Sequence, residues 1–409
     1  MFSWLEGWLL RKLHAAAGSP GVRLAMPSGA QAGSAAAAAP SVVIRDAGTL
    51  ASLILNPDIA FGEGYSDGRI EIHGDLLELL DSIYCSSRDK HDPAWYSRLY
   101  SWWLQIMQRN TRRGSRHNIH RHYDLGNDFY KLWLDRQLLY TCAYFPSPEV
   151  SLEEAQVAKM DHVCRKVVLR PGELVVEAGC GWGALALHMA RYYGVRVKAF
   201  NISHEQILYA RWRARQEGLQ DKVEFIEDDY RNIRGRFDAF MSVGMLEHVG
   251  VSNYREFSRV VRRCVGDTGR GLLHFIGRNK GQPLNAWIRK RIFPGGNPPS
   301  LREAITIFEP WDFSVVDVEN LRLHYASTLE HWLDRFEKSA QQVANMFDER
   351  FVRMWRLYLA GSIAAFRSGS MQLFQVVFSG NKCSSLPWTR AVLYQDLERQ
   401  EPEWSHAHG

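Results

Sequence analysis

One short segment places a thiol among aromatic side chains, Tyr140-Thr-Cys-Ala-Tyr-Phe145, directly before Pro146. A cysteine in such a place can serve as a nucleophile, as a metal ligand or as part of a pocket wall. A nucleophilic thiol needs a neighbouring base, and a metal site needs further ligands at suitable spacing. These six residues leave all three interpretations of Cys142 open.

A second segment, Glu177-Ala-Gly-Cys-Gly-Trp-Gly183, joins an apolar strand pattern to a helical pattern. Glycines at such a junction let the backbone turn sharply and approach a ligand closely. The third glycine of a dinucleotide fingerprint is absent, and so is the Lys-Ser/Thr of a phosphate-binding loop. Glu177 favours a cationic ligand, and S-adenosylmethionine carries an ammonium group. A Rossmann-like dehydrogenase, or a glycine turn used only for packing, fits the segment less well.

Polar residues follow the next two predicted strands. Asn201-Ile-Ser-His-Glu-Gln206 comes after the second strand, where the ribose hydroxyls of such a ligand would lie. Asp228-Asp229-Tyr230 comes after the third and offers a carboxylate for the adenine amino group with a ring beside it. Both segments support a prediction of S-adenosylmethionine binding.

Two residues are candidates for acid–base chemistry. Glu247 and His274 come at the ends of the strand-like runs FDAFMSVGML and GLLHF. Both are therefore expected near the carboxyl edge of a parallel sheet, where open α/β proteins bind their ligands. A buried Glu–His pair can also be purely structural, so the pattern alone leaves that alternative open.

The elements that must position these residues begin after Pro171. Strand-like and helix-like runs then alternate, which predicts a doubly wound parallel sheet at roughly 170–280 with helices on both faces. Residues 281–378 are rich in aromatic side chains and predicted to be largely helical, with the longest helical run at 328–369. We assign 101–378 to one catalytic domain with a helical region, for which the family resemblance given below implies lipid binding, and 379–409 to a C-terminal tail.

The N-terminal part has a different character. Apolar residues in the first segment repeat at helical spacing and end in basic residues, which fits an interfacial helix or a helix packed on its own chain. Residues 15–40 are rich in Ala, Gly, Ser and Pro, so 1–40 is predicted to be a helix and a flexible linker. Residues 41–100 are predicted to be a small α+β domain with a strand, a helix, a Gly-rich turn and a short strand pair. A stretch rich in Arg and His at 109–121 fits a mobile loop, or a lid or headgroup contact.

The composition of the chain restricts the class of protein to which it can belong. The 409 residues are 46% apolar and 12% aromatic, enough for a large core, and no stretch is long and apolar enough to span a bilayer. The six cysteines form no C-x-x-C pair, so neither a metal site nor a disulfide framework is predicted, and a reducing cytoplasm is expected. A net charge of +5 is too weak to predict nucleic-acid binding but is compatible with an anionic membrane surface.

Taken together, the motifs resemble those of the cyclopropane-fatty-acyl-phospholipid synthase family, which includes the mycolic acid cyclopropane synthases. The resemblance runs from about residue 50 to residue 378. Its segments, in chain order, are HYDLGNDFYKLWLD, YTCAYF, EAGCGWG, NIS followed by EQ, DDYR, SVGMLEHVG, LLHFIG, IFPGG and FRSGSMQLFQVVF.

The resemblance implies a class I S-adenosylmethionine-dependent methyltransferase fold, a Rossmann-like doubly wound sheet with helical lipid-binding insertions and a small α+β N-terminal domain. It also implies a set of cofactor contacts along the chain. These would be Tyr140, Thr141, Val175, Val176, Glu177, Ala178, Gly179, Cys180, Gly181, Trp182, Gly183, Asn201, Ile202, Ser203, Gln206, Asp229 and Tyr230. Glu177 departs from the family, which usually has Asp there, and Gln206 is the favoured ribose partner.

The family also implies a bicarbonate ion in the active site. Its side-chain partners would be Glu247, His274 and Tyr325, while Cys142 and Ile276 would offer backbone groups. Some members carry a cysteine where this chain has Ser362, so an essential thiol at that position is not expected. Because methyl transfer to an alkene needs no covalent enzyme intermediate, the wall interpretation of Cys142 becomes the prediction.

The implied activity is transfer of a methylene group from S-adenosylmethionine to the cis double bond of phospholipid acyl chains. An S-adenosylmethionine-dependent C-methyltransferase giving a methyl-branched or methylated unsaturated chain is the alternative. A non-catalytic lipid-binding protein and a small-molecule methyltransferase fit less well. The expected setting is the cytoplasmic face of the membrane, with a possible homodimer and no nucleic-acid partner. The predicted aromatic walls are Tyr140, Tyr144, Phe145, Phe275 and Tyr325.

Overall fold

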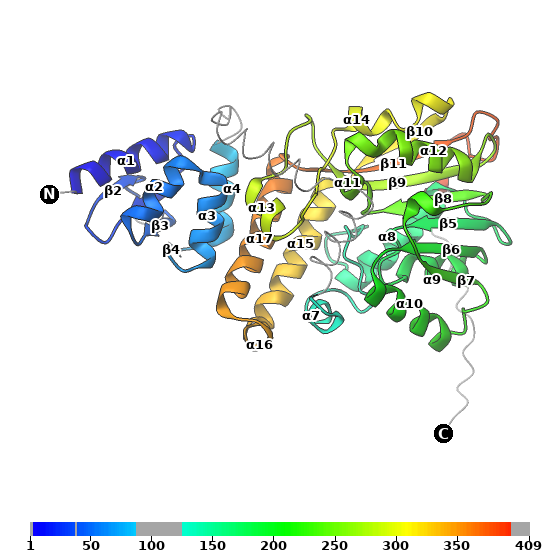
Figure 1. The fold of residues 1–409 in the computed structure, drawn as a ribbon, viewed down its shortest axis with the longest axis horizontal. Helices are drawn as coiled ribbons and strands as arrows, with labels where there is room; N and C mark the ends of the chain where they lie inside the picture. Colours follow the sequence, from blue (N-terminus) through cyan, green and yellow to red (C-terminus); the bar gives the residue numbers. More distant parts are fainter. Residues whose placement is uncertain (1–2, 37–38, 87–124, 394–409) are drawn as a thin grey trace, which may run out of the picture.

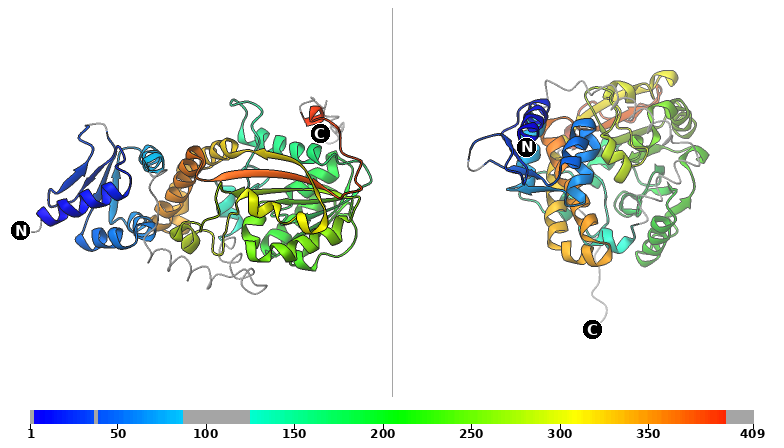
Figure 2. Two further views of the ribbon diagram at one scale, coloured as in Figure 1. Left: turned by 90° about the horizontal axis from the view of Figure 1, so that it is seen from above. Right: turned by 60° about the vertical axis from the view of Figure 1, so that its left-hand side comes forward.

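The computed structural model describes residues 3–36, 39–86 and 125–393. A small N-terminal domain lies at one end of an elongated molecule and a seven-stranded sheet at the other, with long helices between them (Figures 1 and 2). The basic stretch at 109–121, and the part of the predicted tail beyond residue 393, lie outside the described residues.

The N-terminal domain is a four-stranded sheet with helices packed on it. Its strand order is β2-β1-β3-β4, with β1 and β3 parallel and the other pairs antiparallel. The strands are β1 (Arg23–Ala25), β2 (Gln31–Gly33), β3 (Ser41–Ile44) and β4 (Ile70–His73). The helices are α1 (Ser3–Ala16), α2 (Ala47–Leu55), α3 (Pro57–Ser66) and α4 (Leu76–Ser86).

The prediction of a flexible linker at 15–40 is wrong. Strands β1 and β2 lie within it, and Val22, Leu24 and Met26 are buried in the core of the domain. These apolar residues alternate with polar or small ones, which is the period of a half-buried strand. The abundance of Ala, Gly and Ser around them concealed this alternation in the sequence.

The predicted Gly-rich turn is confined to a short turn at Gly68, between α3 and β4, and the predicted strand pair is wrong. Gly62 and Gly64 lie within helix α3, and β4 is the single strand that follows. A Cβ at Gly62 would lie 2.4 Å from the ring of Trp287, and one at Gly64 would lie 2.7 Å from Ile70. The glycines therefore allow close packing of α3 rather than a turn.

The catalytic part contains a seven-stranded sheet in the order β10-β11-β9-β8-β5-β6-β7. The five strands from β5 to β9 are parallel, whereas β11 pairs antiparallel with both β9 and β10. The bounds are β5 (Leu174–Ala178), β6 (Arg196–Asn201), β7 (Val223–Glu227), β8 (Ala239–Val243), β9 (Arg270–Gly277), β10 (Ser314–Asn320) and β11 (Gln372–Ser379).

Helices cover both faces of this sheet, as predicted, and a separate apolar core fills each side. Helix α8 begins with a capping box in which Ser151 and Glu154 satisfy each other's backbone donors. The helices associated with the sheet are α8 (Leu152–Lys166), α9 (Ala184–Tyr192), α10 (His204–Gln216), α11 (Leu246–Val249) and α12 (Tyr254–Val265), with short 3₁₀ turns η1 (Tyr230–Asn232) and η2 (Val251–Asn253).

Residues 281–378 are largely helical, but they also supply β10 and β11, so the sheet is mixed and extends beyond the predicted limit at 280. The predicted long helical run is divided among three helices. This part contains α13 (Ala286–Arg291), α14 (Leu301–Ile305), η3 (Glu309–Trp311), α15 (Arg322–Lys338), α16 (Ala340–Met346) and α17 (Glu349–Ser368); α7 (Asn127–Lys131) precedes the sheet and η4 (Ala391–Leu393) follows it.

Helices α7, α15 and α17 meet in an aromatic core. Trp133 contacts Trp332 with ring centroids 5.6 Å apart and Trp355 at 5.8 Å, and all three rings are buried. Such packing supplies a rigid apolar wall beside the sheet. Of the helices in the described residues, none combines the length and hydropathy required to cross a membrane.

Candidate active site

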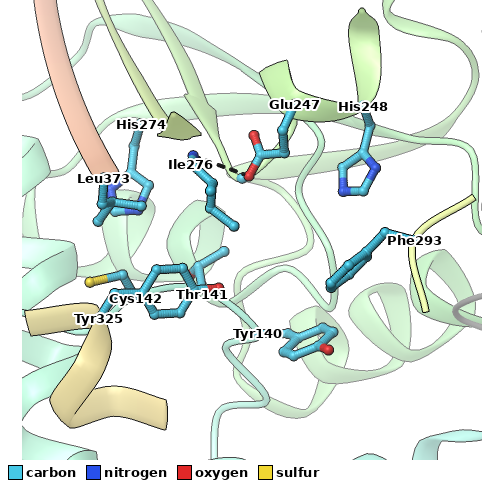
Figure 3. A pocket seen from close by; sticks show the side chains of 11 residues that line it. Tyr140, Thr141, Cys142, Glu247, His248, His274, Ile276, Phe293, Tyr325 and Leu373 are labelled. Carbon is cyan, nitrogen blue, oxygen red and sulfur yellow. Dashed lines mark hydrogen bonds between the residues drawn. The ribbon is translucent and has the colours of Figure 1, made fainter. Parts of the chain in front are cut away.

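A pocket lies at the carboxyl edge of the sheet, between β8, β9 and the helical part (Figure 3). All five residues predicted to act in catalysis line it. The lining residues are Tyr140, Thr141, Cys142, Gly244, Glu247, His248, His274, Ile276, Phe293, Tyr325 and Leu373. The structure thus brings together segments that are up to 233 residues apart in the sequence, from Tyr140 to Leu373.

The sheet register explains how Glu247 and His274 come to the same place. Strands β8 and β9 are parallel, and Val243 at the end of β8 pairs with His274. Gly244 then adopts a φ of 72°, which turns the chain so that Glu247 lies on the short helix α11 above the strand end. In β9 His274 and Ile276 share one face of the strand, since side chains alternate.

Glu247 is a buried carboxylic acid that receives little hydrogen bonding from its surroundings. It is 6% exposed; its Oε1 accepts a long hydrogen bond of 3.4 Å from the Ile276 N–H, and its Oε2 has no hydrogen-bond partner among the described residues. Burial raises the pKa of Glu247 to about 7, and the backbone hydrogen bond from Ile276 opposes this shift only in part. A carboxyl of this kind can exchange a proton near neutral pH.

His274 is held as a neutral imidazole. It is 2% exposed, and burial, together with the charges of Lys159 and Lys166, lowers its pKa well below the usual value. Its Nδ1 accepts a hydrogen bond from Gln375 Nε2 at 3.1 Å, across the β9–β11 pair in which these residues are direct partners. With the amide in this orientation the ring carries its proton on Nε2, which has no partner among the described residues. His274 can therefore donate a hydrogen bond to a ligand.

Cys142 forms part of the pocket wall, as predicted. Its thiol is wholly buried and donates to the Ala143 carbonyl with an Sγ–O distance of 3.1 Å. Burial raises the pKa of the thiol far above its usual value. A thiol that stays protonated is a poor nucleophile, so the surroundings of Cys142 favour the wall interpretation. No group of three or more potential metal ligands is found in the described residues.

The aromatic lining differs from the prediction in three positions. Tyr140 and Tyr325 line the pocket, but Tyr144, Phe145 and Phe275 do not. Phe275 points away because it alternates with His274 along β9, and it is buried in the opposite core. The Tyr144 ring stacks between His162 and His324, with centroid distances of 4.2 and 5.0 Å; Phe145 stacks on His331 at 5.5 Å.

Four lining residues were not predicted, and two of them, His248 and Phe293, add rings to the pocket; the other two are Gly244 and Leu373. His248 and Phe293 lie in segments of the family resemblance, LEHVG and IFPGG, but their roles cannot be read from spacing because each reaches the pocket through a turn. His248 follows Glu247 on α11, and burial lowers its pKa to about 4. It is therefore neutral at physiological pH, like His274.

The glycine loop has the geometry of a ligand-binding turn. Gly179, Gly181 and Gly183 have φ values of 86°, 53° and 86°, a region that favours glycine. A Cβ at Gly183 would lie 2.6 Å from the Phe225 ring, whereas one at Gly181 would meet nothing within 4 Å. The loop is therefore packed tightly at its helical end and open over Gly181, where a ligand can lie against the backbone.

Glu177 fits a cationic ligand at this loop. Its Oε2 is buried and has no hydrogen-bond partner among the described residues. Burial raises its pKa to about 8, and the Lys159 charge opposes the shift. The ammonium group of S-adenosylmethionine would supply the missing partner and favour the ionised carboxylate.

Lys159 was missed in the sequence, where it is one basic residue on an ordinary helix. It is 1% exposed, and its Nζ donates to Thr141 Oγ1 at 2.7 Å. Burial lowers its pKa to about 8, opposed by the charges of Asp135 and Glu177. Lys159 thus holds the segment containing Cys142 by a hydrogen bond, and its charge acts on Glu177 at the end of β5.

Other predicted cofactor residues have supporting roles in this structure. Val175 and Val176 are wholly buried within β5, with partners on both sides, so they hold the strand rather than line the loop. Their contact with the cofactor stays a prediction. Ala178 is also buried at the strand end, and Cys180 is 6% exposed within the loop. Trp182 donates from its indole N–H to Asn127 Oδ1 at 2.7 Å.

The polar groups after β6 are tied to the loop. Asn201 Nδ2 donates to Gln206 Oε1 at 2.7 Å and to the Gly181 carbonyl at 3.3 Å, and Asn201 Oδ1 accepts from the Ile202 N–H at 2.8 Å. Ser203 caps helix α10. This network holds Gln206, 3% exposed, beside the glycine loop.

Asp229 and Tyr230 lie after β7. The Asp229 carboxylate accepts from the backbone N–H and the guanidinium of Arg231, at 2.9 Å each. Arg231 also lies over the Tyr230 ring, 5.0 Å from its centroid. The Asp229 contact with adenine stays a prediction, and it would use the remaining lone pairs of the carboxylate.

Two features define a class I S-adenosylmethionine-dependent methyltransferase. One is the strand order, with one antiparallel strand inserted beside five parallel ones; the other is an open glycine loop that follows a buried acid at the end of β5. The chain belongs to the mycolic acid cyclopropane synthetase family, whose profile it matches over residues 110–376. Residues 28–91 match a separate domain family of unknown function.

Curated relatives modify lipids. A probable fatty acid methyltransferase of Pseudomonas putida is 36% identical over 351 residues, which cover 82% of this chain and 86% of the relative. Cyclopropane-fatty-acyl-phospholipid synthase of Escherichia coli K12 is 43% identical over 259 residues, 63% of this chain and 66% of the relative. The protein is thus an S-adenosylmethionine-dependent lipid methyltransferase of this family.

Solved structures agree with the fold. The cyclopropane synthase MmaA2 from Mycobacterium tuberculosis is 27% identical, with a TM-score of 0.62 over 64% of this chain and 97% of that one. Mycolic acid cyclopropane synthase CmaA1, solved with SAH and CTAB, is 29% identical with a TM-score of 0.61 over 64% and 97%. SAH, the form of the cofactor that remains after methyl transfer, is therefore bound in a related structure.

Proposed function

We propose that the protein is a cyclopropane-fatty-acyl-phospholipid synthase that adds a methylene group from S-adenosylmethionine to the cis double bond of an acyl chain. The observation that carries the proposal is a pair of buried atoms without hydrogen-bond partners among the described residues, Glu247 Oε2 and His274 Nε2, in an aromatic-lined pocket at the carboxyl edge of the sheet. Unsatisfied buried polar atoms cost free energy, so their retention points to a ligand.

The first step depends on positioning. An isolated alkene is a weak nucleophile, so its π bond must lie about 3–3.5 Å from the methyl carbon and in line with the departing sulfur. The π electron pair forms a C–C bond to the methyl group while the C–S bond breaks, releasing S-adenosylhomocysteine. Tyr140, Phe293 and Tyr325 line the pocket and would stabilise the resulting carbocation through their ring faces, by ~2 kcal/mol where water is excluded.

The second step removes a proton from the transferred methyl group as its carbon closes the ring on the cation. Glu247, with its pKa raised to about 7, is ionised in part at neutral pH, and neutral His274 can donate from Nε2. These two residues with Tyr325 fit a small oxyanion, and bound bicarbonate would supply a base there. Cys142 and Ile276 would contribute their backbone N–H groups to the same ion.

A second candidate function ends differently. If a proton leaves a carbon of the acyl chain instead of the methyl group, the product is a methyl-branched or methylated unsaturated chain. The relative from Pseudomonas putida favours this candidate by its description, and so does the tuberculostearic acid methyltransferase UfaA1 of Mycobacterium tuberculosis, 33% identical over 372 residues.

The test uses the whole protein with S-adenosylmethionine labelled at the methyl group and vesicles of a cis-monounsaturated phospholipid. Fragmentation and NMR of the acyl chains distinguish a cyclopropane ring from a branched or unsaturated product. A ring carrying the label supports the first function, a methyl branch supports the second, and no labelled lipid contradicts both. A saturated phospholipid is the matched control, since it offers no π bond.

Other features of the proposal concern the setting. We propose that the enzyme acts at the cytoplasmic face of the membrane on phospholipid substrates, and that it forms a homodimer. The division into a small N-terminal domain, a catalytic domain to about residue 378 and a C-terminal tail is part of the same proposal, with the N-terminal domain now including the strands before residue 41.

A further inference from the structure

Helix α1 packs on the N-terminal domain with one face only. Gly7 and Leu10 are buried beneath it, but Trp4 is 75% exposed, and Leu5 and Trp8 are each 43% exposed. Positions 4, 5 and 8 lie on one side of a helix, so the three apolar side chains form a single patch. An exposed cluster of large apolar residues on a helix usually marks an interaction surface.

Basic residues extend this patch along the helix. Arg11 and Lys12 are both exposed and follow Trp8 by three and four positions, which places them on the same side. The Lys12 ammonium lies 5.6 Å from the centre of the Trp8 ring. The acidic residue of the helix, Glu6, accepts a hydrogen bond from Ser28 of the domain. The exposed side of α1 is therefore apolar at one end, cationic at the other, and free of acidic side chains within the described residues.

We propose that this face of α1, formed by Trp4, Leu5, Trp8, Arg11 and Lys12, docks the enzyme on an anionic phospholipid surface. Indole rings favour the boundary between acyl chains and headgroups, and cationic side chains are attracted to anionic headgroups. A second copy of the chain would bring like charges together, so the charge pattern favours the lipid over a symmetric dimer. The inference rests on the proposed function only in choosing a lipid surface as the occupant.

The position of α1 suits a tether. It lies at the end of the molecule opposite the methyltransferase sheet (Figures 1 and 2). The pocket is lined by residues between 140 and 373, so none of them belongs to α1. Docking through α1 therefore holds the enzyme at the lipid surface without covering the catalytic residues.

The experiment measures flotation of the whole protein with phosphatidylcholine vesicles, with and without phosphatidylglycerol. All acyl chains are saturated, so binding does not depend on the reaction. The variants are the pair Trp4→Ser with Trp8→Ser and the pair Arg11→Glu with Lys12→Glu. Trp212→Ser is the matched control, because Trp212 is 53% exposed on helix α10.

The expected result is that the wild-type protein and Trp212→Ser bind anionic vesicles equally, while each double variant binds at least about tenfold more weakly. All variants should retain wild-type turnover of a detergent-dispersed unsaturated phospholipid, which separates this inference from the proposed function. Wild-type binding by both double variants would overturn it, as would equal loss in Trp212→Ser. So would gel filtration in which Trp4→Ser with Trp8→Ser dissociates a dimer without changing vesicle binding.

Discussion

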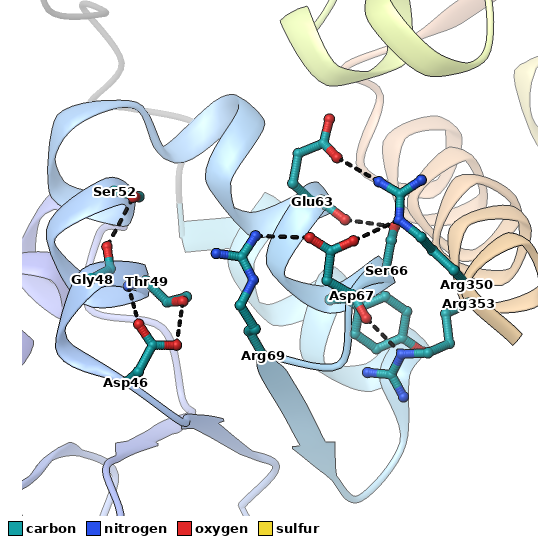
Figure 4. Close-up of polar contacts among 12 residues, drawn as sticks. Asp46, Gly48, Thr49, Ser52, Glu63, Ser66, Asp67, Arg69, Arg350 and Arg353 are labelled. Carbon is teal, nitrogen blue, oxygen red and sulfur yellow. Dashed lines mark hydrogen bonds and ion pairs between the residues drawn. The ribbon is translucent and has the colours of Figure 1, made fainter.

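Two glutamates, the half-buried Glu63 and the buried Glu247, have opposite environments, and the difference separates a structural site from a reactive one. Glu63 of α3 lies where the N-terminal domain meets the helical part, within hydrogen-bond distance of Lys290, Arg291 and Arg350 at 3.0, 2.7 and 3.0 Å. Figure 4 shows the contact with Arg350. Glu247 has no cationic partner among the described residues and one long hydrogen bond from a backbone N–H (Figure 3).

The pKa values follow from these contacts. Burial alone would raise the pKa of Glu63, but hydrogen bonds and charges from Arg291 and Lys290 outweigh it and hold the pKa below its usual value. Burial raises the pKa of Glu247 to about 7, because only backbone hydrogen bonds, and no cationic side chain, oppose it. A carboxylate that is fully paired contributes to docking of domains, whereas one left unpaired is available to a ligand.

The largest effect is expected for Glu247→Gln. The amide keeps the shape but cannot hold or accept the proton, so turnover should fall by about 10²–10⁴-fold. The thermal midpoint should stay equal or rise, because an uncompensated buried acid is removed. Product formation by mass spectrometry and thermal unfolding measure the two quantities. Turnover within tenfold of wild type would end the proposed role of Glu247.

A smaller effect is expected for Gln375→Leu. Loss of the hydrogen bond to His274 Nδ1 frees the imidazole to change tautomer, and kcat should fall about tenfold with little change in the KM for S-adenosylmethionine. Gln372→Leu is the matched control, since Gln372 is buried on the same strand but bonds to Asn320 and Gly369. A ¹⁵N NMR shift of the His274 ring should accompany the loss only in Gln375→Leu; an unchanged spectrum would contradict this role.

Glu63→Gln should affect stability and leave chemistry intact. The three cations around Glu63 are partly exposed, so the cost is modest, about 1–2 kcal/mol in the free energy of unfolding. Denaturant unfolding measures it, with turnover expected within about twofold of wild type. A large loss of turnover without loss of stability would contradict the structural role assigned to Glu63.

The two glutamates should also respond to pH with opposite sign. Glu63, with a lowered pKa, contributes stability above its unfolded value of 4.5, and this is lost as the pH falls through the folded value. Glu247, with a raised pKa, contributes stability below 4.5, and this is lost as the pH rises through about 7. As the pH rises from about 5 to about 8, the thermal midpoint of Glu247→Gln should therefore increase relative to that of the wild type. A difference in thermal midpoint between Glu247→Gln and the wild type that stays constant across this pH range would disprove the raised pKa of Glu247.

The smallest effect is expected for Cys142→Ala. Cys142 lies in the same pocket as Glu247, but its thiol donates to the Ala143 carbonyl and stays protonated. Turnover should stay within about threefold of wild type, with a loss of about 1 kcal/mol in stability from the small cavity. A steady-state assay beside Glu247→Gln tests this; a loss comparable to that of Glu247→Gln would restore the thiol as a functional group.

Local patterns predicted the parallel strands, the glycine loop and the placement of Glu247 and His274. Each of these follows from a periodicity or a turn within a few residues, because side-chain alternation and glycine conformations are local properties. The same patterns failed for Tyr144, Phe145 and Phe275, whose aromatic character fits a pocket wall and a core equally well. They failed again at residues 22–33, where small residues hid a strand alternation.

The sequence by itself determined the class of fold, the cofactor loop and the acid at its strand end, since these depend on residue types at short spacing. Only the tertiary structure decided which polar groups are satisfied. Gln375 meets His274 because β11 inserts beside β9, and Lys159 reaches Thr141 because α8 packs against that edge. Glu63 is neutralised by residues more than 220 positions away, and Glu247 is not. Burial and long-range pairing set the pKa of a carboxyl, and neither is encoded in the residues beside it.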